Sequence, residues 1–200
     1  TGVSYLGCED ERIWDSTPNT NTDKAIRLLA KIPTMIAADF RFKKGLDFIP
    51  PTPTLSISEN FFNMCFGKVP EKEVVKAFDV SLILYAEHSF NASTFATRVV
   101  TSTESDIYSA TVAGIGALKG PLHGGANEQV MIMLKKIGTI EKAKAFVVDA
   151  LAAKEKVMGI GHRVYKNGDP RAAILRKISD KLTADNNEHH LYEMSTLIDD

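Results

Sequence analysis

The sequence lacks both a hydrophobic run long enough to cross a membrane and an excess of charge of either sign. Charged residues interrupt its apolar stretches well before the ~20 apolar residues that a spanning helix needs. Its 24 Lys and Arg residues nearly balance its 25 Asp and Glu residues, so no general basic field would attract nucleic acid. We therefore expect neither a membrane partner nor a nucleic-acid partner, and an anionic ligand would need a local basic cluster.

Cysteine is scarce as well. Cys8 and Cys65 are the two cysteines among 200 residues, and they show no metal-ligand spacing, which is typical of a protein from a reducing cytoplasm. The five histidines form no His-Glu-x-x-His motif, so we predict no metal site.

Sustained alternation of apolar and polar residues is also lacking, so the sequence predicts no strands and an all-α fold. Hydrophobic residues make up 44% and charged residues 24% of the chain, values typical of a soluble globular protein. We place a domain boundary at a glycine pair, with residues 1–124 in a larger helical domain and 125–200 in a smaller one.

Local sequence signals for helices occur along the chain. Residues 1–21 are rich in turn formers and predict a loop, whereas apolar residues three and four apart predict a helix over 22–43. Ser56 and Glu59 form a capping box ahead of a shorter helix, and Pro70 predicts the start of the next one.

Three further signals follow. Asn91 is expected to cap a helix that begins just after His88. A helix rich in Ala and Gly over 107–118 favours close packing against another helix. Asp169 and Pro170 predict the start of a later helix.

The stretch Gly120-Pro121-Leu122-His123-Gly124-Gly125-Ala126-Asn127 places one histidine on a sharp corner between two helices. Glycines there would let the backbone pass close to a ligand. The first N–H groups of the following helix would lie near the imidazole and favour its neutral form, which can donate a hydrogen bond to a carbonyl oxygen. A structural histidine in an ordinary glycine turn is the alternative for this stretch alone.

A second histidine, His162, lies in a basic loop. Between Lys154 and Lys181 there are eight Lys or Arg residues against three acidic ones. This local excess indicates an anionic ligand, for which Arg171 supplies a planar fork that can bind a carboxylate. A solvated basic face is the alternative interpretation.

Taken together, these stretches resemble the citrate synthase family, which includes the 2-methylcitrate synthases. The matching motifs are Tyr85-Ala86-Glu87-His88 with Asn91-Ala92-Ser93-Thr94, then Gly120 to Glu128, then Gly159-Ile160-Gly161-His162-Arg163-Val164-Tyr165 with Asp169-Pro170-Arg171. Their order and spacing agree with the family, and the resemblance covers essentially the whole chain. It implies a two-domain, all-α fold of which this chain is an internal part, truncated at both ends.

The resemblance also implies roles for individual residues. His123 would donate a hydrogen bond to the thioester carbonyl of acetyl-CoA, and His162 would polarise the ketone carbonyl of oxaloacetate. His88 and Arg171 would bind that 2-oxo acid, with Asn91 as an orienting residue of the substrate site. Coenzyme A, a co-substrate and not a permanently bound cofactor, would contact the loop around the second histidine through Lys156, Met158, Gly159, Gly161 and Lys166.

The base that removes the α-proton in this family is an aspartate expected beyond Asp200, so we expect these residues alone to be inactive. The expected reaction of the intact enzyme is citrate formation, the entry step of the tricarboxylic acid cycle, in a cytoplasmic homodimer formed through helices 22–43 and 107–118. Three alternatives stay open: propionyl-CoA as the donor, a non-catalytic helical CoA-binding module, and a metal-dependent helical hydrolase.

Overall fold

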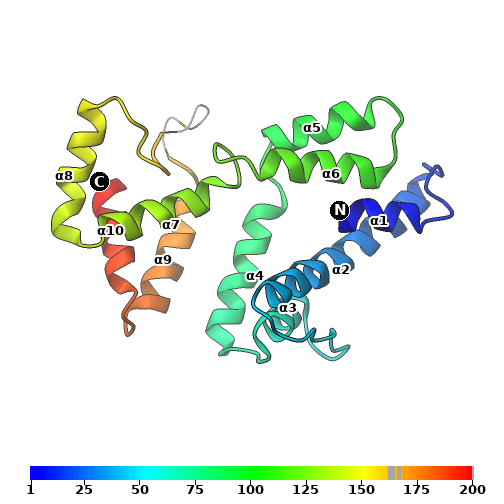
Figure 1. Ribbon diagram of the computed structural model, residues 1–200, viewed down its shortest axis with the longest axis horizontal. Helices are drawn as coiled ribbons and strands as arrows, with labels where there is room; N and C mark the ends of the chain where they lie inside the picture. Colours follow the sequence, from blue (N-terminus) through cyan, green and yellow to red (C-terminus); the bar gives the residue numbers. More distant parts are fainter. Residues whose placement is uncertain (162–164, 166–167, 200) are drawn as a thin grey trace. The chain divides into compact units, whose positions relative to one another are not determined.

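The computed structural model describes residues 1–161, 165 and 168–199. These residues form ten α-helices and no strand (Figure 1), which confirms the all-α prediction for this part of the chain. They divide into two compact units, Thr1–Leu118 and Lys119–Asp200. The predicted domain boundary at 124–125 falls inside the second unit, and its role as a hinge stays a prediction.

The first unit holds six helices. They are α1 (Gly2–Cys8), α2 (Pro18–Lys43), α3 (Ile57–Phe66), α4 (Lys72–Ala86), α5 (Ala92–Thr101) and α6 (Ile107–Leu118). One buried cluster joins α1, α2 and α6 through Val3, Leu6, Leu28 and Tyr108, and a second joins α2 to α3 through Ala37, Met64 and Cys65.

The second unit holds α7 (Ala126–Ile137), α8 (Ile140–Ala152), α9 (Ala172–Thr183) and α10 (His189–Asp199). Among the residues described in this unit, one cluster of buried apolar residues forms the core: Met133, Leu134, Ile137, Ala143, Ala150, Val157 and Met194. Val157 belongs to the loop that follows α8, so the core anchors the start of the basic loop. Among the helices described in the two units, none is long and apolar enough to cross a membrane.

Several boundaries follow the local signals. Both hydrogen bonds of the capping box between Ser56 and Glu59 are present, and Gly67 ends α3 in the left-handed conformation with φ 74°, where glycine is unstrained. The N–H of Thr94 donates to Asn91 Oδ1 over 3.0 Å, which confirms the predicted cap of α5. The helix predicted at Pro70 starts slightly later, at Lys72.

The prediction of a loop over 1–21 is wrong at both ends. Gly2–Cys8 is a helix and α2 already starts at Pro18. A helix as short as α1 has little stability of its own. Burial of Val3 and Leu6 against Tyr108 of α6 stabilises it, and no local sequence signal reports that contact.

Close packing of α6 is confirmed within the first unit, where α5 and α6 lie side by side (Figure 1). A Cβ built on Gly114 would lie 2.5 Å from Thr97 Oγ1 of α5, so the missing side chain is what permits this approach.

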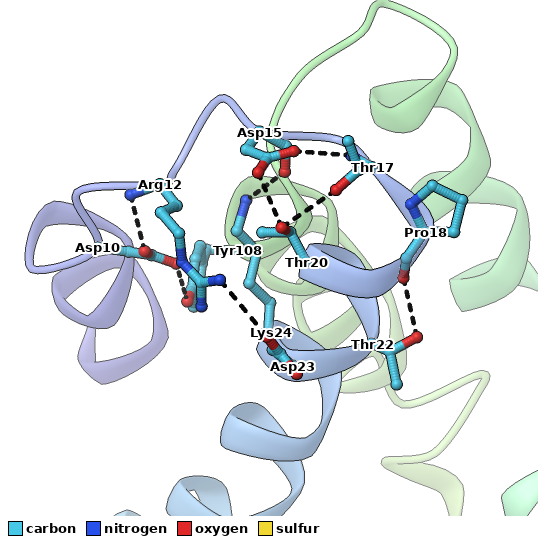
Figure 2. A network of polar contacts seen from close by, with 10 residues as sticks. All are labelled: Asp10, Arg12, Asp15, Thr17, Pro18, Thr20, Thr22, Asp23, Lys24 and Tyr108. Atoms are coloured by element: carbon cyan, nitrogen blue, oxygen red, sulfur yellow. Dashed lines mark hydrogen bonds and ion pairs between the residues drawn. The ribbon is translucent and has the colours of Figure 1, made fainter.

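A polar network ties the segment after α1 to α2 and α6 (Figure 2). The hydroxyl of Tyr108 donates to Asp10 Oδ2 over 2.6 Å, and both side chains are buried. Lys24, only 2% exposed, donates from Nζ to the carbonyl oxygens of Ile13 and Asp15 over 2.9 and 2.8 Å. Every buried charge in this network therefore has polar partners.

We expect Tyr108→Phe to lower the free energy of unfolding by about 1–3 kcal/mol, because the buried Asp10 carboxylate loses the Tyr108 hydroxyl as a donor while it keeps the N–H of Arg12. The hydrogen bond from Tyr108 lowers the pKa of Asp10 from its ordinary 3.8. Burial and that bond raise the pKa of Tyr108 from its ordinary 10.0. The lowered pKa of Asp10 contributes stability that is fully present above pH 3.8 and is lost as the pH falls through the pKa of the folded state. The raised pKa of Tyr108 contributes stability that is fully present below pH 10.0 and is lost as the pH rises through the pKa of the folded state.

Denaturant unfolding at several pH values measures this difference between wild type and Tyr108→Phe. The difference should be constant near neutral pH and shrink at both extremes. A difference that stays the same in strong acid would contradict the contribution of Asp10.

Candidate active site

His123 lies on a tight turn that joins α6 to α7. Its N–H donates to the carbonyl oxygen of Gly120 over 2.9 Å, and the N–H of Gly125 donates to the same oxygen over 3.1 Å. The carbonyl of His123 then accepts from the N–H of Ala126, the first residue of α7, over 3.0 Å. The backbone on both sides of the half-buried imidazole is thereby fixed directly ahead of a helix N-terminus.

Gly125 is needed at this corner for a reason other than the predicted one. Its φ of −65° is ordinary for any residue, so conformational freedom is not the requirement. A Cβ there would lie 2.5 Å from the carbonyl oxygen of Lys119 and 2.8 Å from that of Gly120. The space beside Gly125 is occupied by backbone of the same turn, not kept open for a ligand.

His88 lies in the five-residue connection between α4 and α5. Asn91 holds this connection: its Nδ2 donates to the carbonyl oxygen of His88 over 3.3 Å. Its Oδ1 accepts from Ser93 Oγ over 2.7 Å as well as from the N–H of Thr94. Asn91 therefore fixes the backbone of His88 relative to the start of α5, which is consistent with an orienting role.

The basic loop after α8 is built from a buried anchor and an exposed turn. Val157 is buried in the core of the second unit, and its carbonyl accepts from the N–H of Ile160 over 3.2 Å. Met158 packs against the same core. Lys156, Gly159 and Gly161 are exposed, and both glycines have positive φ, 88° and 78°. Backbone polar groups of this turn are thus accessible to a ligand.

Arg171 and Asp169 form a half-buried ion pair. Arg171 donates from Nε to Asp169 Oδ1 over 3.0 Å and from Nη2 to Oδ2 over 2.7 Å. The N–H of Arg171 donates to Oδ1 as well, over 2.9 Å. The helix predicted at Pro170 starts slightly later, at Ala172, and its N-cap is Arg171 and not Asp169 as predicted. Asp169 instead sets the direction in which the Arg171 guanidinium points.

Two of the predicted site residues, His162 and Lys166, lie outside the described residues. The others are divided between the units, with His88 and Asn91 in the first and His123, Arg171 and the loop 156–161 in the second. Within the described ranges, no group of three or more His, Cys, Asp or Glu side chains could hold a metal ion.

The chain also matches known proteins. The family model for the C-terminal domain of citrate synthase matches residues 1–200, the full chain. The chain belongs to the citrate synthase family. This membership confirms the resemblance found in the motifs around His88, His123 and His162.

Relatives of this chain include both citrate synthases and 2-methylcitrate synthases. Citrate synthase of Mycolicibacterium smegmatis is 57% identical over 176 residues, which are 88% of this chain and 47% of that protein. The 2-methylcitrate synthase of Mycobacterium tuberculosis is 52% identical over 182 residues, 91% of this chain and 46% of that protein. The chain therefore spans about half the length of these relatives.

A solved structure of the family supports the fold. It is the ternary complex of carboxymethyl coenzyme A and oxaloacetate with citrate synthase from Thermoplasma acidophilum. It superposes with a TM-score of 0.92 at 35% identity and covers 98% of this chain and 52% of that one. The helical arrangement is thus that of the citrate synthases.

Proposed function

We propose that the protein to which this chain belongs is a citrate synthase, which condenses acetyl-CoA with oxaloacetate and water to give citrate and coenzyme A. Family membership over all 200 residues carries this proposal. The structure of the Thermoplasma acidophilum relative with carboxymethyl coenzyme A and oxaloacetate supports the two substrates.

The residues fit the chemistry of this condensation. The acetyl methyl carbon loses a proton to a base, and the resulting enolate carries negative charge on the thioester oxygen, where His123 is proposed to donate a hydrogen bond. The same carbon then forms a bond to the ketone carbon of oxaloacetate, whose oxygen His162 is proposed to polarise. Water finally cleaves the thioester carbon–sulfur bond and releases coenzyme A.

Substrate binding is assigned to individual residues. His88, oriented by Asn91, and the guanidinium of Arg171 would bind oxaloacetate. Asp169 accepts hydrogen bonds from Nε and Nη2 of that guanidinium and so sets its orientation. Lys156, Met158, Gly159, Gly161 and Lys166 are proposed to contact coenzyme A.

The acyl donor is the open part of this assignment. The 2-methylcitrate synthase of Mycobacterium tuberculosis is nearly as similar to this chain as the Mycolicibacterium smegmatis citrate synthase is, so propionyl-CoA is the second candidate. The sequences Pro121-Leu122 before His123 and Arg163-Val164-Tyr165-Lys166 after His162 favour acetyl-CoA.

A thiol-release assay tests the function and the donor together. The full-length protein, supplied with oxaloacetate, should release free coenzyme A faster from acetyl-CoA than from propionyl-CoA, and the 200-residue chain should release none, because the proposed base lies beyond Asp200. Faster release from propionyl-CoA would reassign the protein as a 2-methylcitrate synthase. No release by the full-length protein would favour a non-catalytic CoA-binding module.

The proposed enzyme is a cytoplasmic homodimer. Large apolar side chains of α2 and α6 are exposed on the first unit, among them Leu29 at 62% and Leu118 at 45%, and burial against a second copy would remove them from water. Light scattering of the full-length protein should give twice the mass of one chain, and a monomer would contradict this assembly.

A further inference from the structure

The connection that carries His88 contains a side chain whose role the family motifs do not assign. Glu87 follows the last residue of α4 in an extended conformation, and its Oε1 accepts from the N–H of Ser89 over 2.5 Å. The carboxylate thus reaches past His88 to the next residue along the chain.

Glu87 and Asn91 hold the two polar atoms of one peptide group. The peptide between His88 and Ser89 contributes its N–H to Glu87 and its carbonyl oxygen to Asn91 Nδ2. A peptide group is planar, so bonds at both polar atoms fix its orientation. This orientation sets ψ of His88 and φ of Ser89, and with them the direction of the His88 side chain.

The backbone conformation of Ser89 at this peptide is unfavourable without supporting contacts. Ser89 has φ 56°, one of three positive values at non-glycine residues in the part of the chain that the structure describes. Such values persist where surrounding contacts enforce them, often at functional sites. Here the enforcing contact at the N–H of Ser89 is the carboxylate of Glu87.

Phe90, also in this connection, contacts α5. The ring of Phe90 lies edge to face with that of Phe95 at 5.9 Å, and the Arg98 guanidinium lies 5.2 Å from the centre of the Phe90 ring. The His88–Ser89 peptide therefore lies between Glu87, which directly follows α4, and Phe90, which contacts α5.

We propose that Glu87 is a positioning residue for His88. It completes, with Asn91, a clamp on the His88–Ser89 peptide, and so presents the imidazole in the direction in which it binds the 2-oxo acid. This inference rests on the proposed function of His88. It predicts that Glu87 acts on substrate binding through His88 and not on the stability of the fold.

Steady-state kinetics of the full-length enzyme test the clamp. Glu87→Ala should raise KM for oxaloacetate about tenfold, the loss expected for one hydrogen bond to a charged group. It should change kcat less than about threefold, because binding is lost equally in the ground state and the transition state. Glu87→Gln should stay within about threefold of wild type, because its amide oxygen still accepts from Ser89.

Variants of Ser89 probe the backbone directly. Ser89→Gly should keep KM near the wild-type value, since glycine adopts positive φ without strain. Ser89→Val should raise KM as Glu87→Ala does, since a β-branched residue resists that conformation. Glu73→Ala, which removes the same charge from the first turn of α4, is the matched control and should leave KM unchanged.

A double-mutant cycle separates the clamp from the function of His88. In the His88→Ala background, Glu87→Ala should add no further loss, because the two changes act on one group. An unchanged KM in Glu87→Ala while His88→Ala raises it would overturn the clamp alone. An unchanged KM in His88→Ala would overturn the proposed role of His88. Equal losses for Glu87→Ala and Glu87→Gln, with a lower unfolding temperature, would show a structural role and also overturn the clamp.

Discussion

His123→Ala is expected to lower kcat of the full-length enzyme by about 10²–10³-fold, the range measured when one donor to a developing oxyanion is removed. Three backbone hydrogen bonds hold the turn, two of them at His123 itself, so removing the imidazole should leave the turn in place. KM for acetyl-CoA should change little, because the proposed bond strengthens as charge develops in the transition state.

His123→Asn and His190→Ala make the comparison specific. An Asn amide can donate a hydrogen bond and should recover part of the lost activity, whereas Ala cannot. His190 lies at the start of α10, where its Nδ1 contacts the carbonyl oxygen of Asn187, and its replacement should leave kcat within about twofold of wild type. Retention of most activity in His123→Ala would remove this residue from the mechanism.

Gly125→Ala is the second change for which we expect a large effect. The added methyl would meet two backbone carbonyl oxygens at 2.5 and 2.8 Å, and backbone atoms cannot rotate away as a flexible side chain does. We expect the free energy of unfolding of the second unit to fall by about 3 kcal/mol, the upper part of the range for overpacking. Release of coenzyme A should fall with it, because the turn that presents His123 must rearrange.

Amide hydrogen exchange measures this change locally. Protection should fall over residues 119–137 and stay unchanged in α1 and α2 of the first unit. Leu122→Ala is the control on the same turn, since Leu122 is 74% exposed and its truncation removes no buried contact. Wild-type protection in Gly125→Ala would mean that the turn relaxes without cost.

The sequence predicted most of the helices because their signals are local. The capping box at Ser56 and Glu59, the cap at Asn91 and the small residues of 107–118 each involve positions within a few residues of one another. These short-range rules hold in any context that leaves the segment helical. The first twenty-one residues show the limit, because α1 depends on burial against α6.

Part of the site was predictable for the same reason and part was not. The histidine motifs identified the family from residues alone. Asp169 was interpreted as a helix cap, although Asp-Pro-Arg spacing places its carboxylate within reach of the Arg171 fork. Glu87 stands in one of the matching motifs, but the motif gave it no role, because its bond to the N–H of Ser89 accompanies a left-handed backbone conformation that serine rarely adopts.

Sequence by itself determined the fold class and the family and singled out three histidines as candidate site residues, because periodicity, caps and motifs are properties of neighbouring residues. Tertiary structure decided which side chains and backbone groups come into contact. Tyr108 pairs with Asp10, 98 positions away in the sequence, only once the chain has folded. The carbonyl oxygens that exclude a side chain at Gly125 likewise take their places only when the turn has formed.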